Sequence, residues 1–321
     1  MKRKLIFAAF TLFQASFTFG QTYYDLVAKA NTAYLKTDYK NSLLFYQESF
    51  KLDKSHPEDL YNGACSAALA NETAVSFELL NLSIQQGWTN INHLKNDGDL
   101  LSLHQDGNWP ILLKTLQDRI DKSEAGYDRK LQKELEAIYD DDQDIRMKFN
   151  DSATKNGYQN PEVIRIGNLM NFQDSINKRK VTKILDEKGW VGIDLVGHKA
   201  NETLFLVIQH ADLQTQEKYL PMMREAVKKG NASNSSLALL EDRIAIREGR
   251  KQIYGSQVGM NSKTNEMYVQ PLENPETVDS RRATMGLAPL AYYLLNWNIV
   301  WNVEEYKIHL PEYEKWVKAE Y

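Results

Sequence analysis

The sequence has few residues that staple a chain or break its secondary structure: one cysteine, 8 prolines and 16 glycines among 321 residues. A single cysteine excludes an internal disulfide and a zinc site built on several thiolates. Lys and Arg total 39 against 43 Asp and Glu, so the chain has no global positive field that would recruit nucleic acid. With 42% hydrophobic residues, its length predicts a globular protein with two domains.

Several motifs of enzymes and metal sites are also absent. The sequence contains no H-E-x-x-H, no P-loop and no G-x-S-x-G pattern. Of its six histidines only His198 and His210 are close in sequence, and a metal site formed by these two with Asp212 would lack the usual ligand spacing. We therefore expect no metal and no cofactor. The lone Cys65 lies in an alanine-rich segment and is interpreted as a small buried residue.

The N-terminus has the pattern of a secretory signal peptide over residues 1–20. Three basic residues precede an apolar stretch over residues 5–19, and Thr18 and Gly20 occupy the small-residue positions before the cleavage point. An N-terminal membrane anchor is the alternative, but the stretch is short and interrupted by polar residues. The residue directly after the predicted cleavage point is Gln21 and not a cysteine, so the sequence lacks the lipid-attachment residue of a lipoprotein. We expect an exported protein, periplasmic or extracellular, with neither a lipid anchor nor a membrane span after cleavage.

Residues 21–120 show apolar residues at helical spacing, interrupted by short turns. Turns are indicated at Thr37-Asp38-Tyr39 and Ala70-Asn71-Glu72, and alanines near residues 64–68 would let neighbouring helices pack closely. Tyr39 and Tyr46 stand where the tetratricopeptide repeat, with a period of about 34 residues, has its inter-helix aromatic and a bulky residue. The segment resembles a short array of such repeats, of which about two are visible.

So short an array has two interpretations. It is either a helical support for the rest of the chain or a groove that binds a peptide, and a groove needs several stacked units. We expect a support that also contacts a protein partner. The oligomeric state is left open.

Residues 121–130 are strongly polar and are interpreted as a linker to a domain over residues 131–321. The acidic run at 140–144 lacks the spacing of a calcium loop and is interpreted as a solvated helix face, in a helix marked by Leu131, Leu135 and Ile138.

Within about residues 131–294 a series of short motifs follows in a fixed order. The elements are Asp142-Gln143, Arg146, Asp174, Asn177, Gly189-Trp190, Val196-Gly197, Gln209-His210-Ala211-Asp212, Gln216, Asp242-Arg243, Gly249, Gln252, Tyr254-Gly255-Ser256-Gln257, Val278-Asp279, Arg281-Arg282 and Gly286-Leu287-Ala288-Pro289-Leu290. The series resembles a bacterial family known chiefly as a domain of unknown function, with QHAD, DR and YG(T/S)Q motifs. The resemblance implies a mainly helical fold and no established activity.

The periodicity of the residues gives the same outline. Residues 200–210 predict an apolar helix that ends at His210, and Asp212 is a candidate N-cap for the next helix, which Pro221 would kink or break. Residues 235–248 predict a third helix, on which Asp242 points about 100° away from Arg243. The fold class is therefore mainly α, a short tetratricopeptide-like hairpin array followed by a helical domain with irregular loops. An aromatic-rich tail from residue 286 is expected to pack over the core.

The motif residues include groups suited to acid–base chemistry. His210 is the candidate general base, Asp212 or Asp242 would orient its ring, and Arg243 would hold an anionic group. The candidate substrate-binding residues are Gln209, Gln216, Gln252, Tyr254 and Gln257. The same residues could instead form a structural hydrogen-bond network.

Three functions follow from this set. The leading expectation is a binding protein, in which the repeats contact protein and the second domain carries a polar pocket. The alternative is a hydrolase that uses His210 with an Asp and Arg243. The third is a structural scaffold, in which these side chains are buried against one another.

Overall fold

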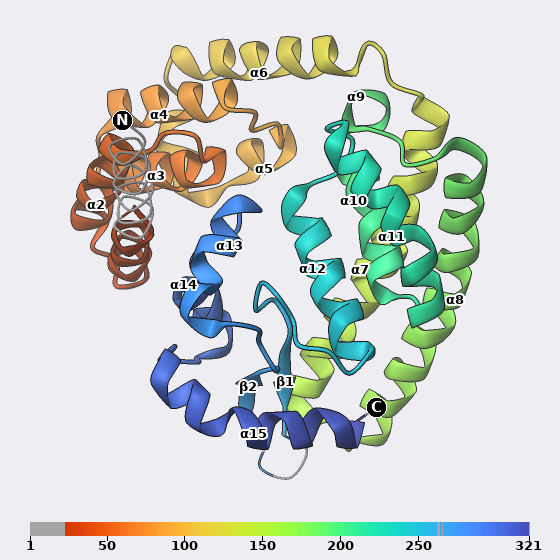
Figure 1. Cartoon of the computed structure of the whole chain (residues 1–321). Helices are drawn as coiled ribbons and strands as arrows, with labels where there is room; N and C mark the ends of the chain where they lie inside the picture. The colour runs from red at the N-terminus through yellow and green to blue at the C-terminus, as the bar shows by residue number, and fades with distance from the viewer. Residues whose placement is uncertain (1–22, 262–263, 265, 321) are drawn as a thin grey trace, which may run out of the picture. The chain divides into compact units, whose positions relative to one another are not determined.

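A computed structural model describes residues 23–261, 264 and 266–320 (Figure 1). The predicted signal peptide at 1–20 therefore lies outside the described residues. The chain divides into two compact units, residues 1–123 and 124–321. The fold is mainly α, as predicted, and consists largely of helical hairpins.

The first unit is a series of antiparallel helices. A helix over residues 23–35 precedes α2 (Tyr39–Leu52), α3 (Pro57–Leu69), α4 (Thr73–Gln85), α5 (Ile91–Asn96), the 3-10 helix η1 (Gly98–Leu103) and α6 (Asn108–Glu124). Both predicted turns are present, and Thr37 and Asn71 adopt positive φ angles of 59° and 64° in them. Asp38 caps α2 by accepting from the backbone N–H of Asn41. The resemblance to tetratricopeptide repeats remains a prediction.

Small residues allow α2 and α3 to pack closely. A Cβ placed on Gly63 would lie 2.9 Å from the ring of Phe50. The buried hydroxyls of Ser42 and Ser66 meet at 2.9 Å across the same pair of helices. One apolar core, with Leu60, Ala64 and Leu80 among its members, runs through this unit. Close packing of small against large side chains explains why the alanine-rich pattern predicted these hairpins.

The second unit begins with long helices. They are α7 (Arg129–Asn156), α8 (Pro161–Lys188), α9 (Ile193–Val196), α10 (His198–His210), α11 (Leu213–Lys228) and α12 (Asn234–Arg247). Apolar residues of α7, α8, α10, α11 and α12 form its main core, with Leu135, Val181 and Leu204 fully buried. Asp212 caps α11 by accepting from the N–H of Thr215, as predicted.

Shorter elements follow α12. They are β1 (Val258–Met260), β2 (Met267–Val269), η2 (Pro275–Thr277), α13 (Val278–Thr284), α14 (Leu290–Tyr293), η3 (Leu294–Trp297) and α15 (Val303–Glu320). β1 and β2 are antiparallel, with Gly259 opposite Tyr268. Tyr268 packs in a small cluster with Ile246 and Val317, which joins this hairpin to α12 and to α15 (Figure 1).

Three local features refine the expectations from the sequence. Pro221 does not break the helix, because α11 continues through it from Leu213 to Lys228, and the buried Tyr219 and Met223 anchor the helix on both sides of the proline. The predicted linker 121–130 is partly helical, since α6 extends to Glu124 and α7 starts at Arg129. The two-stranded hairpin was not predicted, and its strands are only three residues long.

The acidic run is a solvated face with one exception. Asp140, Asp141 and Asp144 are exposed, whereas Asp142 is only 1% exposed. Asp142 continues the stripe of Leu131, Leu135 and Ile138 at a spacing of four, three and four residues. That spacing keeps one face of α7 directed at the core, so the carboxylate is carried inward with the apolar side chains.

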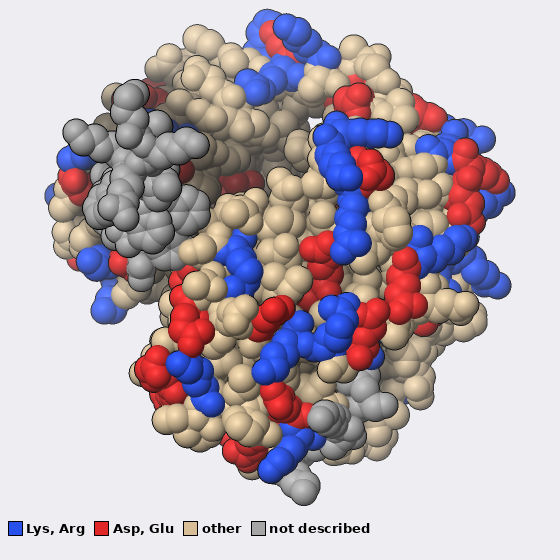
Figure 2. Space-filling view, in the orientation of Figure 1, with Lys and Arg blue, Asp and Glu red and all other residues tan. Residues whose placement is uncertain are grey.

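The surface shows mixed charge. On the face drawn in Figure 2, basic and acidic side chains lie interspersed, with apolar and neutral polar atoms between them. Within the described residues, no helix combines the length and apolar character that a membrane crossing requires.

Candidate functional site

A charged cluster joins three helices of the second unit. Asp142 and Arg146 lie one turn apart on α7, Asp174 lies on α8, and His210 is the last residue of α10. The guanidinium of Arg146 donates from Nη2 to both carboxylate oxygens of Asp174 at 2.9 Å. Its Nη1 donates to the backbone oxygen of Asp142 at 3.2 Å. Nδ1 of His210 lies 3.1 Å from Oδ1 of Asp142. We call these four residues the His210 cluster.

The hydrogen bonds fix the protonation pattern of the imidazole. Nε of Arg146 points at Nε2 of His210 at 3.4 Å, and a guanidinium can only donate. Nε2 must therefore accept, which leaves the ring proton on Nδ1, where it is donated to Asp142. A buried carboxylate behind Nδ1–H is the arrangement that orients a histidine in acid–base catalysis.

The electrostatics favour an ionised Asp142. Burial raises the pKa of its carboxyl, but the hydrogen bond and electrostatic attraction from the Nδ1–H of His210, together with the positive charge of Arg146, outweigh burial, so the net shift of the pKa is downward. Gln143 adds a further hydrogen bond to Oδ2 at 2.7 Å. The buried charge is thus paired and fully hydrogen-bonded, as a charge in a protein interior must be.

Access to the cluster is limited. The side chains of His210, Arg146 and Asp174 are 19%, 18% and 19% exposed. Both ring nitrogens of His210 have protein partners, and each nitrogen of Arg146 donates to an oxygen or nitrogen of the cluster. A general base needs a free lone pair toward its substrate, and here the long contact from Arg146 occupies that position.

The carboxylate that faces His210 was not the one expected. Asp212 instead caps α11 and pairs with Nζ of Lys178 at 2.7 Å, which lowers the pKa of the Asp212 carboxyl to about 2. Its side chain is 49% exposed. The expectation that Asp212 or Asp242 orients the ring of His210 is therefore wrong. The partner is Asp142, 68 residues away in the sequence, a separation that no local pattern could bridge.

Asp242 has a different role, which is to hold the loop after α12. Its fully buried carboxylate accepts from the backbone N–H groups of Ile253, Tyr254 and Ser256 at distances of 2.6 to 3.2 Å. The predicted divergence of Asp242 from Arg243 on the helix is confirmed by these partners. Backbone donors in an irregular loop would otherwise be buried unpaired, so this carboxylate stabilises the loop.

Gln252 and Tyr254 belong to the same loop. Nε2 of Gln252 donates to the backbone oxygens of Gln257 and Gln270 at 2.9 and 2.8 Å, and its Oε1 accepts from the N–H of Gln257. The hydroxyl of Tyr254 reaches Glu241 at 3.4 Å. These contacts are those of a structural network, and they bind the loop to the hairpin.

Three of the predicted residues do gather beside His210, around its neighbour Gln209. The backbone oxygen of Gln209 accepts from Nη1 of Arg243 at 3.0 Å and from Nε2 of Gln216 at 2.8 Å. Nε of Arg243 donates to Oε1 of Gln257 at 3.1 Å. The side-chain oxygens of Gln209 and Gln216 are buried and have no hydrogen-bond partner among the described residues. This region is therefore polar, tightly packed and incompletely satisfied.

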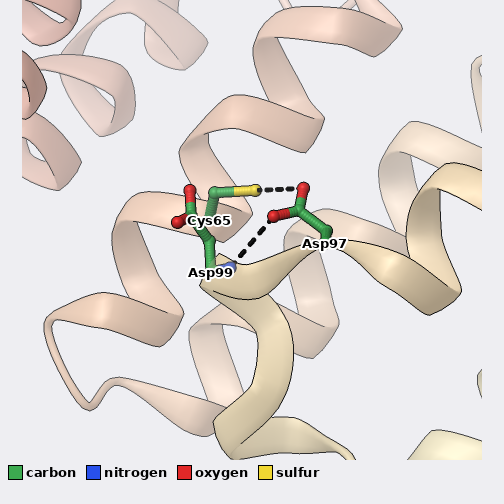
Figure 3. A group of neighbouring side chains, drawn as sticks. All are labelled: Cys65, Asp97 and Asp99. Atoms are coloured by element: carbon green, nitrogen blue, oxygen red, sulfur yellow. Dashed lines mark hydrogen bonds between the residues drawn. The ribbon is translucent and has the colours of Figure 1, made fainter.

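The first unit contains one group of metal-ligating side chains. Figure 3 shows Cys65, Asp97 and Asp99, whose ligand atoms lie within 4.8 Å of one another. Sγ of Cys65 donates to Asp97 at 3.7 Å. The carboxylates of Asp97 and Asp99 also accept from the hydroxyls of Tyr61 and Tyr34, at 2.8 and 2.6 Å. Burial, reinforced by these two carboxylates, raises the pKa of the Cys65 thiol, so Sγ keeps its proton and donates it in a hydrogen bond to Asp97.

The aromatic tail forms the wall of a cavity of about 600 Å³. Its rings come from β2, η3 and α15 and from the residues between the last two elements. The aromatic lining is Tyr268, Trp297, Trp301, Tyr306, Tyr313 and Trp316. Tyr306 of the tail is buried, in line with the predicted packing role, and Tyr268 of β2 is buried as well, while the other four rings are half-buried. We call this space the aromatic cavity.

The comparison with protein families now assigns the second unit. A model described as a family of unknown function, DUF6624, matches residues 129–303. This chain belongs to the DUF6624 family. The whole His210 cluster and most of the cavity lining lie inside the matched range, whereas the lining residues contributed by α15 lie beyond it. Searches of curated proteins and of solved structures found no match to the chain.

The sequence pattern singled out the cluster residues but did not assign them to a common site. Asp142, Arg146 and Asp174 stood among the family-like motifs, but their roles could not be read from them. The available signal was the i,i+4 spacing of Asp142 and Arg146 on a helix whose apolar stripe includes position 142.

Proposed function

We propose that this DUF6624 protein is an exported binding protein whose second unit takes a small molecule in the aromatic cavity. The observation that carries the proposal is the cavity itself, about 600 Å³ in volume and walled by six aromatic side chains. Small-molecule sites are concave spaces of roughly 300–1,000 Å³, lined by aromatic side chains with a few polar groups. Four of the rings remain half-buried, although burying them fully would stabilise the fold.

The His210 cluster supports the same assignment, because its polar groups already have hydrogen-bond partners within the protein. Its charged side chains bond to one another and tie α7, α8 and α10 together. Each polar group that holds the helices together is unavailable to a substrate. In this proposal the cluster is a structural node of the family domain, and binding takes place elsewhere in the unit.

The binding proposal is tested by a thermal-shift screen of the full-length chain against chemically diverse small molecules. A ligand at about one hundred times its Kd stabilises the folded state by about 2.7 kcal/mol, which raises Tm by several degrees. A hit at the cavity loses its shift in Trp301→Leu and keeps it in Leu295→Ala, a change at a 55% exposed residue outside the cavity lining. Hits that keep their shift in both variants would contradict the assignment.

A second candidate function is hydrolysis at His210. The observation in its favour is the buried Asp142 behind Nδ1–H, combined with a ring that is still 19% exposed. In this mechanism Nε2 would exchange its long contact with Arg146 for a water and remove a proton from it. Incubation with chromogenic carboxylic and phosphoric esters tests the candidate, with His210→Gln as the control. Turnover that disappears in the variant supports hydrolysis, and equal rates in both proteins exclude it.

The helical hairpins of the first unit supply a further part of the proposal, contact with a protein partner. Leu35 and Leu44 are 81% and 49% exposed on its first helices. A photocrosslinking residue at position 35, in cells that produce the protein, is expected to trap one defined protein. Crosslinks that are diffuse, or equal to those from the exposed position 122 of the same unit, would contradict it.

Export is tested by sequencing the N-terminus of the protein recovered outside the cytoplasm, which is expected to begin at Gln21.

A further inference from the structure

The rings of the aromatic cavity are tilted relative to one another. Along α15 and the turn before it, the ring centroids of Trp301 and Tyr306 are 5.0 Å apart at 48°, and those of Tyr306 and Tyr313 are 5.7 Å apart at 42°. Tyr313 and Trp316 continue the series at 5.3 Å and 52°. Rings tilted in this way present their faces in several directions, and each ring face carries partial negative charge.

Carboxylates stand at the same wall. Glu305 and Glu312 line the cavity from α15, Glu266 lines it from just before β2, and all three are exposed. Among the described residues, the ion-pair partner of Glu312 is His309 of the same lining, at 3.9 Å, and Glu305 has no ion pair. The described lining contains no Lys or Arg. Lys307, on the same helix, is outside the lining and pairs with Glu276 at 2.8 Å and Glu304 at 3.6 Å.

We propose that the aromatic cavity selects a small organic cation with a methylated ammonium group, and this inference rests on the proposed binding function. Ring faces attract a cation within about 6 Å of their centroids, and methyl groups reduce the cost of removing that cation from water. The three glutamates make the electrostatic potential at the cavity favourable for a cation. A neutral ligand would gain from the rings alone, and an anion would meet these carboxylates with no Lys or Arg among the described lining residues.

A pair of isosteric probes tests the inference on the full-length chain. Choline and 3,3-dimethyl-1-butanol have the same shape, but only choline is charged. Binding of each is followed by tryptophan fluorescence and by calorimetry, and choline is expected to bind about tenfold more tightly. Glu305→Gln combined with Glu312→Gln is expected to reduce that preference severalfold, with Glu266 and the rings retaining the remainder. The matched control is Glu304→Gln, which changes a 75% exposed glutamate of the same helix outside the cavity lining.

The outcomes separate this inference from the function on which it rests. If both probes bind equally, or if the double variant keeps the full preference for choline, the cation inference is overturned. If neither probe binds while a neutral saccharide or another compound does, with loss in Trp301→Leu, the inference is wrong and the binding function stands. If no compound of the screen responds to Trp301→Leu, both are wrong. A near-native thermal unfolding curve of each variant shows that the fold is intact.

Discussion

Nδ1 of His210 lies 3.1 Å from Oδ1 of Asp142, so the last residue of α10 is bonded to the middle of α7 across 68 positions of the chain. The bond joins the only buried acid of the run at 140–144 to the QHAD motif. Arg146 closes the group from the other side and extends it to α8. Side chains of α7, α8 and α10 therefore meet at one point and hold the three helices together.

Replacement of Asp142 tests this junction. Asp142→Asn removes the buried carboxylate that accepts from His210, while Arg146 keeps its two hydrogen bonds to Asp174, so the free energy of unfolding is expected to fall by about 1–3 kcal/mol. Asp144→Asn, at an exposed position of the same helix, is expected to change the free energy of unfolding by less than about 0.5 kcal/mol. Urea unfolding of the two variants checks the difference, and equal midpoints would show that the junction contributes nothing.

The stability of the second unit should fall in acid because of the same carboxylate. The folded-state pKa of Asp142 lies below its ordinary value of 3.8, so folding favours the deprotonated form. Its contribution is complete above the unfolded pKa and is lost as the pH falls from about 4 through the folded pKa. Unfolding free energies between pH 3 and 6 are expected to rise with pH more steeply in the native chain than in Asp142→Asn. Parallel curves would contradict this assignment.

Alanine substitutions at two glycines distinguish the energetic cost of backbone strain from that of steric crowding. Gly249 and Gly255 have φ angles of +72° and +70°, so alanine at either position adopts an unfavourable left-handed conformation. Only at Gly255 would the new Cβ meet a neighbour, since it lies 3.1 Å from Cδ1 of Leu290. Gly249→Ala is expected to cost about 1–2 kcal/mol, and Gly255→Ala about 1–3 kcal/mol more. Urea unfolding midpoints measure the stability of both variants. Equal losses of stability would show that the contact with Leu290 contributes nothing.

The thiol in the first unit should be inert until the chain unfolds. Burial, with the neighbouring Asp97 and Asp99 carboxylates, raises the pKa of Cys65, and the thiolate is the form that reacts with alkylating reagents. Iodoacetamide at pH 8 is expected to leave the native protein unlabelled and to modify one site in urea, as followed by intact mass. Asp97→Asn, which lowers the nearby negative charge, should speed the native reaction. Rapid labelling of the native chain would place the thiol at the surface.

Local patterns predicted the elements but only part of the site. Turn residues such as Thr37 and Asn71, and caps such as Asp212, act over a few positions, so their effects follow from the sequence alone. The pairing of Asp242 away from Arg243 likewise followed from helix geometry. The partner of His210 did not, because Asp142 approaches it only after α7 and α10 pack. One signal was present in the sequence: Asp142 continues the apolar stripe of α7, and this position indicates a buried carboxylate.

The sequence by itself determined that the chain is mainly helical, where most of its helices lie, and that a family domain fills its second half, because helical periodicity, capping and motif order are properties of neighbouring residues. Only the tertiary structure decided which groups are bonded to which. It placed Asp142 behind His210, turned Asp242 to a loop, and left four rings of the aromatic tail half-buried around a cavity. Those outcomes depend on the packing of segments far apart in the chain, which burial of apolar surface drives and which no short-range pattern encodes.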